Sequence, residues 1–300
     1  MAMYPTLMPK QPRMFTASVL RTERRSPTFQ RVTIASDDLA GFEWRGLDHW
    51  FRLFFPLRPD GPLLLPEVKG RQWWTSYLRI PAAERPHCSN YTVAGFRRGE
   101  TIAELDIDVV LHWHDGGLSG VAAWAVNATA DSPVGLLDQG VLFDPPADTD
   151  EYVLVADESG LPALRGILRD LPSDAVGTAI IEVPDAGDVH EVAAPEGLQV
   201  RWVPRDSSDD EVGHRALQEL QTCATRPTAY AFVVGESRLK ANELNFSPNI
   251  KSALAALPAQ GSAGGNDASN QANGGVFISM TPQQARLFMP QLKLAGYANL

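Results

Sequence analysis

The sequence predicts two domains of different class, a β-barrel followed by a smaller α/β domain built on a parallel sheet. The first observation is length, since 300 residues suit about two domains of ~150 residues. In the first half, short segments of alternating apolar and polar residues are separated by turn residues, as in antiparallel sheets. In the second half, continuous apolar runs alternate with segments of helical spacing, as in βαβ units.

The first half contains several segments with the period of a β-strand. The clearest is 104–112, where Leu105, Ile107 and Val109 occupy every second position. Many short strands broken by proline, glycine and charged turns predict a closed barrel or a sandwich. The other strands are expected at 14–20, 29–35, 49–56 and 90–97, with a surface loop over 57–71.

The pattern changes at 144–148, which we interpret as a linker or surface turn. Apolar runs then predict parallel strands, and leucines at helical spacing predict helices between them. The strands are expected at 152–156, 178–183, 198–203 and 229–234, and the helices at 161–171 and 214–223. This gives domains at 13–146 and 147–240 and a divergent tail at 241–300, with a small, polar linker (261–275) and a last short helix within 281–296.

Composition narrows the function classes. The formal net charge of −10 argues against a binder of nucleic acid or of anionic membranes, because both need a basic face. No apolar run reaches the ~18 residues of a membrane span, and the first residues lack the apolar core of a secretory signal. Cys88 and Cys223 are too few for an iron–sulfur cluster or a Cys-rich zinc site. We therefore expect a cytoplasmic protein with reduced thiols.

The segment 156–163, Ala-Asp-Glu-Ser-Gly-Leu-Pro-Ala, follows a predicted buried strand and begins a predicted helix. Ligands of open α/β sheets lie at the carboxyl ends of strands, often against a helix N-terminus. Gly160 would let a ligand approach the backbone, and Pro162 suits a first helical turn. The alternative is a structural connection in which Asp157 or Ser159 caps the helix.

Two segments of the first half carry further candidates. Tyr91 offers a ring that can stack on a flat cofactor, and Thr92 offers a hydroxyl for its polar edge. The alternative for this pair is a half-buried part of a strand. The glycine-rich segment 116–125 would expose backbone N–H groups to a pyrophosphate, or else form a hairpin turn into the next strand.

The run His112-Trp113-His114-Asp115 raises a metal hypothesis. On one strand, His112, His114 and Asp108 share a face, and two imidazoles with a carboxylate can bind iron or zinc. The alternatives are a strand end with paired polar side chains, or contacts to a cofactor. The other histidines lack ligand-like spacing, so the sequence favours a protein without a metal site of its own.

Taken together, these elements resemble the siderophore-interacting protein family, the FAD-dependent ferric-siderophore reductases. The resemblance covers about residues 13–238, and its most specific part, 157–163, is similar to the family's Asp-Glu-Thr-Ala-Leu-Pro-Ala loop. It implies a six-stranded antiparallel FAD-binding barrel followed by a ferredoxin-reductase-like nicotinamide domain. The other segments that carry it are Asn90-Tyr91-Thr92-Val93, Asp108 through His112, Trp124-Ala125 and Val233-Val234-Gly235-Glu236-Ser237.

The resemblance also implies which residues form the sites. Barrel residues would bind FAD, the loops after two parallel strands would bind NAD(P)H, and a basic patch would attract an anionic ferric siderophore. The family usually has arginine at the places of Ser89 and Ala94, so Arg85, Arg97 or Arg98 are candidates to replace it. The residues implied are Tyr91, Thr92, Val93, Asp108, His112, Gly120, Ala123, Trp124, Asp157, Glu158, Ser159, Gly235 and Glu236 for the cofactors, and Arg52, Arg238 and Lys240 for the substrate.

The implied activity is an electron relay from NAD(P)H, or from a ferredoxin, through FAD to Fe(III) in a bound siderophore, which then releases Fe(II). No iron ligand from the protein is needed, because the siderophore already coordinates the metal. Two alternatives stay open: a non-catalytic flavoprotein that binds FAD or a siderophore, and a His-x-His metalloprotein. The tail from about Ala241 departs from the family pattern, and Gly296-Tyr297 is only a partial counterpart of its C-terminal Gly-Tyr-Trp segment.

Overall fold

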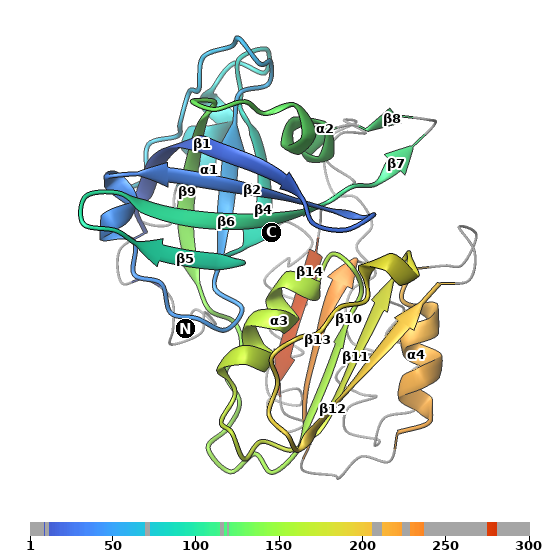
Figure 1. The fold of residues 1–300 in the computed structure, drawn as a ribbon. Helices are drawn as coiled ribbons and strands as arrows, with labels where there is room; N and C mark the ends of the chain where they lie inside the picture. Colours follow the sequence, from blue (N-terminus) through green and yellow to red (C-terminus); the bar gives the residue numbers. More distant parts are fainter. Residues whose placement is uncertain are drawn as a thin grey trace. The chain divides into compact units, whose positions relative to one another are not determined.

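The computed structural model describes residues 9, 12–69, 73–114, 117–118, 120–205, 212–223, 229–236 and 275–280. The chain folds into two compact units, Met1–Val141 and Leu142–Leu300. The fold class predicted from the sequence is confirmed, because the first unit is an antiparallel sheet with barrel-like order and the second is a mainly parallel sheet with helices (Figure 1).

The first unit is one sheet in the order β4-β3-β9-β1-β2-β6-β5, with every neighbouring pair antiparallel. The two edge strands, β4 and β5, are consecutive in the chain and are separated only by Val93 and Ala94. The strands are β1 (Met14–Arg24), β2 (Phe29–Ser36), β3 (Trp50–Phe55), β4 (His87–Thr92), β5 (Gly95–Arg98), β6 (Ala103–Val110) and β9 (Pro133–Gly140).

The predicted continuous strand at 90–97 is wrong, because the chain bends between β4 and β5. At the bend, the Val93 N–H donates to the carbonyl of His49 (2.8 Å), and the Ala94 N–H donates to the carbonyl of Asp106 (2.9 Å). The segment therefore leaves β3 and joins β6, so that one bent segment forms both edges of the sheet. The sheet thus contains seven strands, where the resemblance implies six.

A second correction concerns the glycine-rich segment 116–125. It is predicted as a turn or phosphate loop, but from Gly120 onward it forms helix α2 (Gly120–Asn127). Alanines favour a helix, and Gly120 supplies the left-handed backbone (φ 55°) at its start. The predicted strand at 104–112 ends at Val110. Elements that were not predicted are η1 (Asp38–Gly41), α1 (Trp73–Arg79), β7 (Trp113–His114), β8 (Gly117–Leu118) and β9.

Alternation along β3 divides its side chains between two apolar layers. Phe51, Leu53 and Phe55 point into the main core, which α2 also covers with Val121 and Ala125. Phe54 points to the other side, where Trp73 and Tyr77 of α1 pack on it. Helix α1 thus covers the outer face of β3.

The second unit has the strand order β12-β11-β10-β13-β14, parallel except for the antiparallel β14. This 3-2-1-4 order has its topological switch point between β10 and β13. The predicted strands and both predicted helices are present, whereas β14 is new and the expected helix at 281–296 lies outside the described residues. The elements are β10 (Tyr152–Ala156), α3 (Leu161–Asp170), β11 (Gly177–Val183), η3 (Ala186–Asp188), β12 (Leu198–Pro204), α4 (His214–Gln221), β13 (Tyr230–Glu236) and β14 (Gly275–Met280).

The helices of the second unit pack on different strands. Helix α3 contacts β10 and β13, whereas α4 contacts β11 and β12 (Figure 1). The α4 side chains Ala216, Leu217 and Leu220 form a core cluster with inward residues of the sheet such as Val155 and Val233. Within the described ranges, no helix is long and apolar enough to cross a membrane.

Candidate functional site

The first group of predicted cofactor-binding residues, Tyr91, Thr92 and Val93, lies at the end of β4. Tyr91 lies opposite Phe51 across the β3–β4 pair, is half-buried, and packs against the barrel core. Burial raises the pKa of its phenol, so the hydroxyl stays protonated at neutral pH. Thr92 and Val93 are buried beside it. The bend that follows is fixed by the two backbone hydrogen bonds described above, so these three residues have a defined backbone.

A small stack of rings joins β3, β4 and α2. Phe55 stacks on Trp124 of α2 (centroids 4.7 Å apart) and on His87 of β4 (4.7 Å). The His87 ring shares a hydrogen bond of 3.0 Å with the hydroxyl of Ser89, and burial lowers its pKa to about 4. A Cβ on Gly120 would lie 3.8 Å from the His87 ring, so the start of α2 is next to this neutral pair.

The arginines that the sequence offered in place of an arginine at Ser89 are all committed elsewhere. Arg85 donates to the carbonyls of Leu78 (2.9 Å) and Ile80 (3.0 Å). Arg97 donates to the Asp106 carboxylate (2.6 Å). The third, Arg98, donates to the carbonyl of Phe42 (3.0 Å). None of these three guanidinium groups therefore replaces the arginine that the family usually has at the place of Ser89.

Arg52 lies on the outer face of β3, among aromatic residues. Its guanidinium carbon is 4.8 Å from the Trp73 ring centroid, and Nη1 donates to the Asn90 side chain (3.1 Å). Burial raises the pKa of the neighbouring Cys88 thiol to about 12, although Arg52 opposes this shift. Arg52 is thus partly buried, and a cation–π contact with Trp73 stabilises its charged guanidinium group.

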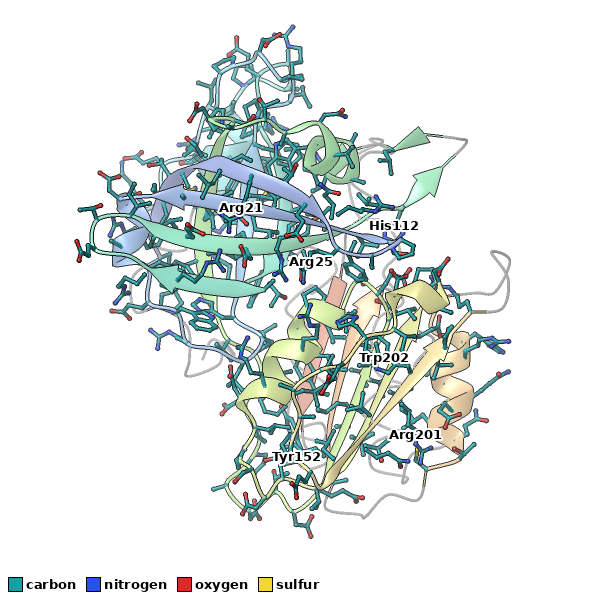
Figure 2. The ribbon with its side chains drawn as sticks, in the orientation of Figure 1. Arg21, Arg25, His112, Tyr152, Arg201 and Trp202 are labelled. Atoms are coloured by element: carbon teal, nitrogen blue, oxygen red, sulfur yellow. The ribbon has the colours of Figure 1, made fainter. Side chains whose placement is uncertain are left out.

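Asp108 and His112 do not share the strand face on which the metal hypothesis depended, because β6 ends at Val110. Asp108 instead forms a bidentate ion pair with Arg31 of β2 (2.7 and 2.8 Å). Figure 2 shows His112 just beyond the end of β6. Among the described residues, no group of three or more His, Cys, Asp or Glu side chains is placed to hold a metal ion.

In the second unit, the β10–α3 loop is organised by Asp157. This carboxylate is completely buried and accepts hydrogen bonds from the Ser159 N–H (2.8 Å), the Ser159 hydroxyl (2.6 Å) and the Gly160 N–H (3.2 Å). A Cβ on Gly160 would lie 2.2 Å from the carbonyl oxygen of Val234 on β13. Gly160 is therefore needed for close helix–strand packing at the switch point, which differs from the ligand approach inferred from the sequence.

Glu158 belongs to a buried ionic cluster, which we define as Glu158, Glu182 and Arg205. Arg205 donates to both oxygens of Glu158 (2.9 and 2.7 Å) and to Oε1 of Glu182 (2.8 Å). Glu182 also accepts from the backbone N–H groups of Gly213 (2.7 Å) and Ala216 (2.8 Å) at the start of α4. The cluster joins the carboxyl ends of β10, β11 and β12 to α4.

Sequence reasoning missed Glu182, Arg205 and His87. Glu182 and Arg205 could have been found as charged residues at the ends of apolar strands, because a charged residue that is buried there needs a partner of opposite charge. Gly235 and Glu236 end β13 at the same edge of the sheet. Arg238 and Lys240 lie outside the described residues.

The barrel residues fit a flavin cofactor. A half-buried aromatic ring, a neighbouring threonine and a fixed, bent backbone suit a flat heteroaromatic ring, and the start of α2 beside Ser89 suits a pyrophosphate. With a doubly wound sheet in the second unit, these features define a two-domain, flavin-dependent oxidoreductase of the kind that also binds a nicotinamide nucleotide.

Comparison with known proteins gives the family. Residues 18–142 match the siderophore-interacting FAD-binding domain, and residues 149–242 match the siderophore-interacting protein domain. The chain belongs to the siderophore-interacting protein family.

Individual relatives agree with this assignment. The chain is 32% identical to the ferric vibriobactin reductase ViuB of Vibrio cholerae over 73% of this chain and 77% of that protein. It is 30% identical to the NADPH-dependent ferric-chelate reductase of Escherichia coli over 80% of this chain and 88% of that protein. The crystal structure of a siderophore utilization protein from T. fusca superposes with a TM-score of 0.61 at 28% identity, covering 75% of this chain and 82% of that one.

Proposed function

We propose that this protein is an FAD-dependent reductase of ferric siderophores that takes its electrons from NAD(P)H. The observation that carries the proposal is the presence, in one chain, of a siderophore-interacting FAD-binding domain and a nucleotide-type parallel sheet. The relatives named above, a ferric vibriobactin reductase and a ferric-chelate reductase, support the same reaction. Ferric siderophore is then the substrate, and Fe(II) is the product.

FAD, when bound, supplies the chemistry that links a two-electron hydride donor to one-electron reduction of Fe(III). The barrel contributes the surface on which the flavin ring is held. Tyr91 provides a ring that keeps its proton at neutral pH, and Thr92 provides a hydroxyl beside it. Asp108, His112, Gly120, Ala123 and Trp124 complete the proposed FAD-binding set, with Trp124 acting through its stack on Phe55.

The proposed nicotinamide-nucleotide site lies at the carboxyl edge of the parallel sheet. There Asp157 fixes the loop between β10 and α3, and Ser159 shapes it by donating to Asp157. Glu158 is held in the ionic cluster, so it positions the edge of the sheet rather than offering a free carboxylate. Gly235 and Glu236 at the end of β13 lie across the switch point from that loop.

We propose that Arg52 contributes a basic surface that attracts the substrate; Arg238 and Lys240, the other two candidates from the sequence, lie outside the described residues. Many ferric siderophores are anionic, and the chain as a whole carries a formal charge of −10, so local cations are needed to attract them. Arg52 keeps its charge against Trp73 and therefore offers both an aromatic and a cationic surface. Two free cysteines and a reductive reaction suit a cytoplasmic location.

The reaction is tested with purified protein loaded with FAD. Under anaerobic conditions, NADH or NADPH should bleach the flavin absorption near ~450 nm, and adding a ferric siderophore should restore it. A ferrous-specific chelator should then detect about two Fe(II) for each nicotinamide oxidised, because a hydride carries two electrons. Protein that binds FAD but is bleached only by a reduced ferredoxin would identify a ferredoxin as the donor. Protein that binds FAD and is never reoxidised by the ferric siderophore would support the non-catalytic alternative and overturn the proposal.

A further inference from the structure

We infer that the nicotinamide donor of this chain is NADH rather than NADPH. The inference rests on the proposed function, and it concerns only the second unit. It follows from how the ionic cluster Glu158–Glu182–Arg205 uses the groups that could bind the additional phosphate of NADPH.

In doubly wound folds, an acidic residue after the second strand binds the ribose 2′-hydroxyl of NAD, whereas a nearby arginine accommodates the 2′-phosphate of NADP. Glu182 lies near the carboxyl end of β11, the second strand, and Arg205 directly follows β12, the third. Here the acidic residue and the arginine bind each other (2.8 Å). The residue type that would select the phosphate is present, but it already has a partner.

Arg205 is not available to a phosphate. Its side chain is only 8% exposed, and its two terminal nitrogens make three hydrogen bonds to Glu158 and Glu182. Releasing it would leave two carboxylates, 1% and 0% exposed, without their counter-charge. Stranding buried charges in this way is strongly unfavourable.

The backbone N–H groups at the start of α4 are also already hydrogen-bonded within the protein. A helix N-terminus is the other common phosphate-binding feature, because its free N–H groups point outward. In α4, the N–H groups of Gly213 and Ala216 already donate to Glu182 (2.7 and 2.8 Å). Arg215 in the first turn donates back to the carbonyl of Pro204 (3.1 Å).

The charge balance at this edge also opposes a second phosphate group. The cluster holds two carboxylates and one guanidinium, and a ribose 2′-phosphate would add a charge of about −1.5 to −2 at pH 7. A neutral ribose hydroxyl avoids this repulsion, and NADPH does not.

The first test measures binding without any redox reaction. Isothermal titration calorimetry of the FAD-loaded protein with ADP-ribose and with 2′-phospho-ADP-ribose should show at least tenfold tighter binding of ADP-ribose, which corresponds to about 1.4 kcal/mol. Equal affinities, tighter binding of the phosphorylated compound, or binding of neither compound would overturn the inference.

The second test uses a matched pair of variants in anaerobic flavin reduction. Glu158→Gln removes one charge from the cluster, so the efficiency of NADPH relative to NADH should rise about fivefold or more. Glu196→Gln makes the same change on an exposed residue just before β12, at the amino edge of the sheet, and should leave the ratio unchanged. Equal ratios in both variants would contradict the inference. The calorimetric comparison needs only the unmodified chain, so it decides the question even if Glu158→Gln fails to fold.

A donor-independent assay separates this inference from the proposed function. Protein whose flavin has been reduced by dithionite, freed of excess reductant, should still reduce a ferric siderophore if the proposed function is correct. If that reaction succeeds while NADPH is preferred to NADH, the inference alone fails. If the reaction fails, the proposed function fails, whatever the calorimetry shows.

Discussion

The two units of this protein handle charge in opposite ways at their candidate sites. In the barrel, Phe55 stacks on the rings of Trp124 and His87, and burial keeps the His87 ring neutral. In the parallel sheet, the corresponding positions at the strand ends carry buried ions, namely Glu158, Glu182 and Arg205. The barrel offers a surface for stacking, whereas the sheet has an edge fixed by ion pairs.

This difference shows where the two units are sensitive to substitution. A neutral, stacked surface loses affinity gradually when a ring is removed, because each contact contributes little. A buried ionic cluster fails abruptly, because the loss of one ion leaves its partners desolvated and unpaired. We therefore expect the largest effects on stability in the second unit and the largest effects on flavin affinity in the first.

The largest effect is expected for Arg205→Met, which leaves Glu158 and Glu182 buried without a counter-charge. The free energy of unfolding should fall by about 3 to 5 kcal/mol in urea denaturation. The matched control is Arg201→Met on β12, the strand that Arg205 directly follows; Arg201 is labelled in Figure 2. Arg201 pairs with Glu219 at partly exposed positions (28% and 35%), so its loss should cost only about 0.5 kcal/mol. Similar costs for both variants would remove the contrast between buried and exposed pairs.

The next effect concerns packing in the second unit. Gly160→Ala would place a methyl group against the backbone of Val234, at 2.2 Å from its carbonyl oxygen, so α3 must move away from β13. We expect the free energy of unfolding to fall by about 3 kcal/mol. In the control Gly117→Ala, the added methyl group meets no atom within 4 Å, and the change should stay within about 0.5 kcal/mol. If both variants are equally stable, close packing at Gly160 does not constrain the switch point.

The third prediction concerns how the free energy of unfolding depends on pH through the buried, neutral His87 of the first unit. The His87 pKa is about 4 in the folded state, against about 6.5 in an unfolded chain. Between these two pH values the unfolded state binds more protons, so the free energy of unfolding falls as the pH drops from 6.5 towards 4. Over that window, His87→Phe should lose about 2 kcal/mol less stability than the unmodified chain, because it keeps a ring against Phe55 and cannot take a proton. Parallel stability curves for the two proteins would show that His87 is not held neutral by the fold.

The second unit was easier to predict from sequence than the first. The run Tyr152–Ala156 is apolar throughout, and the leucines after it keep helical spacing, so β10 and α3 follow from local patterns. In the first unit, the bend at Val93 and Ala94 depends on hydrogen bonds to His49 and Asp106, which are distant in sequence. No local pattern encodes such partners, so the bent segment looks like one straight strand.

The residues of the candidate site also differ in how well the sequence predicts them. Tyr91 and the Asp157 loop are recognisable as short motifs, because their neighbours in sequence are also their neighbours in space. The cluster Glu158–Glu182–Arg205 joins residues 47 and 23 positions apart, and only the strand order brings them together. Knowledge of the 3-2-1-4 order, combined with charged residues at three strand ends, would have been sufficient to predict it.

The smallest effect is expected for Tyr91, and it is measured as flavin affinity rather than stability. Tyr91→Ala removes the ring but leaves the backbone bend, so the dissociation constant for FAD should rise about tenfold, or about 1.4 kcal/mol. Tyr91→Phe keeps the ring and removes a hydroxyl that stays protonated, so it should change the constant less than about threefold. Quenching of flavin fluorescence on titration of protein into FAD gives both values. A Phe variant as weak as the Ala variant would show that the hydroxyl, rather than the ring, binds the cofactor, and would place a polar requirement on a surface that we describe as a stacking surface.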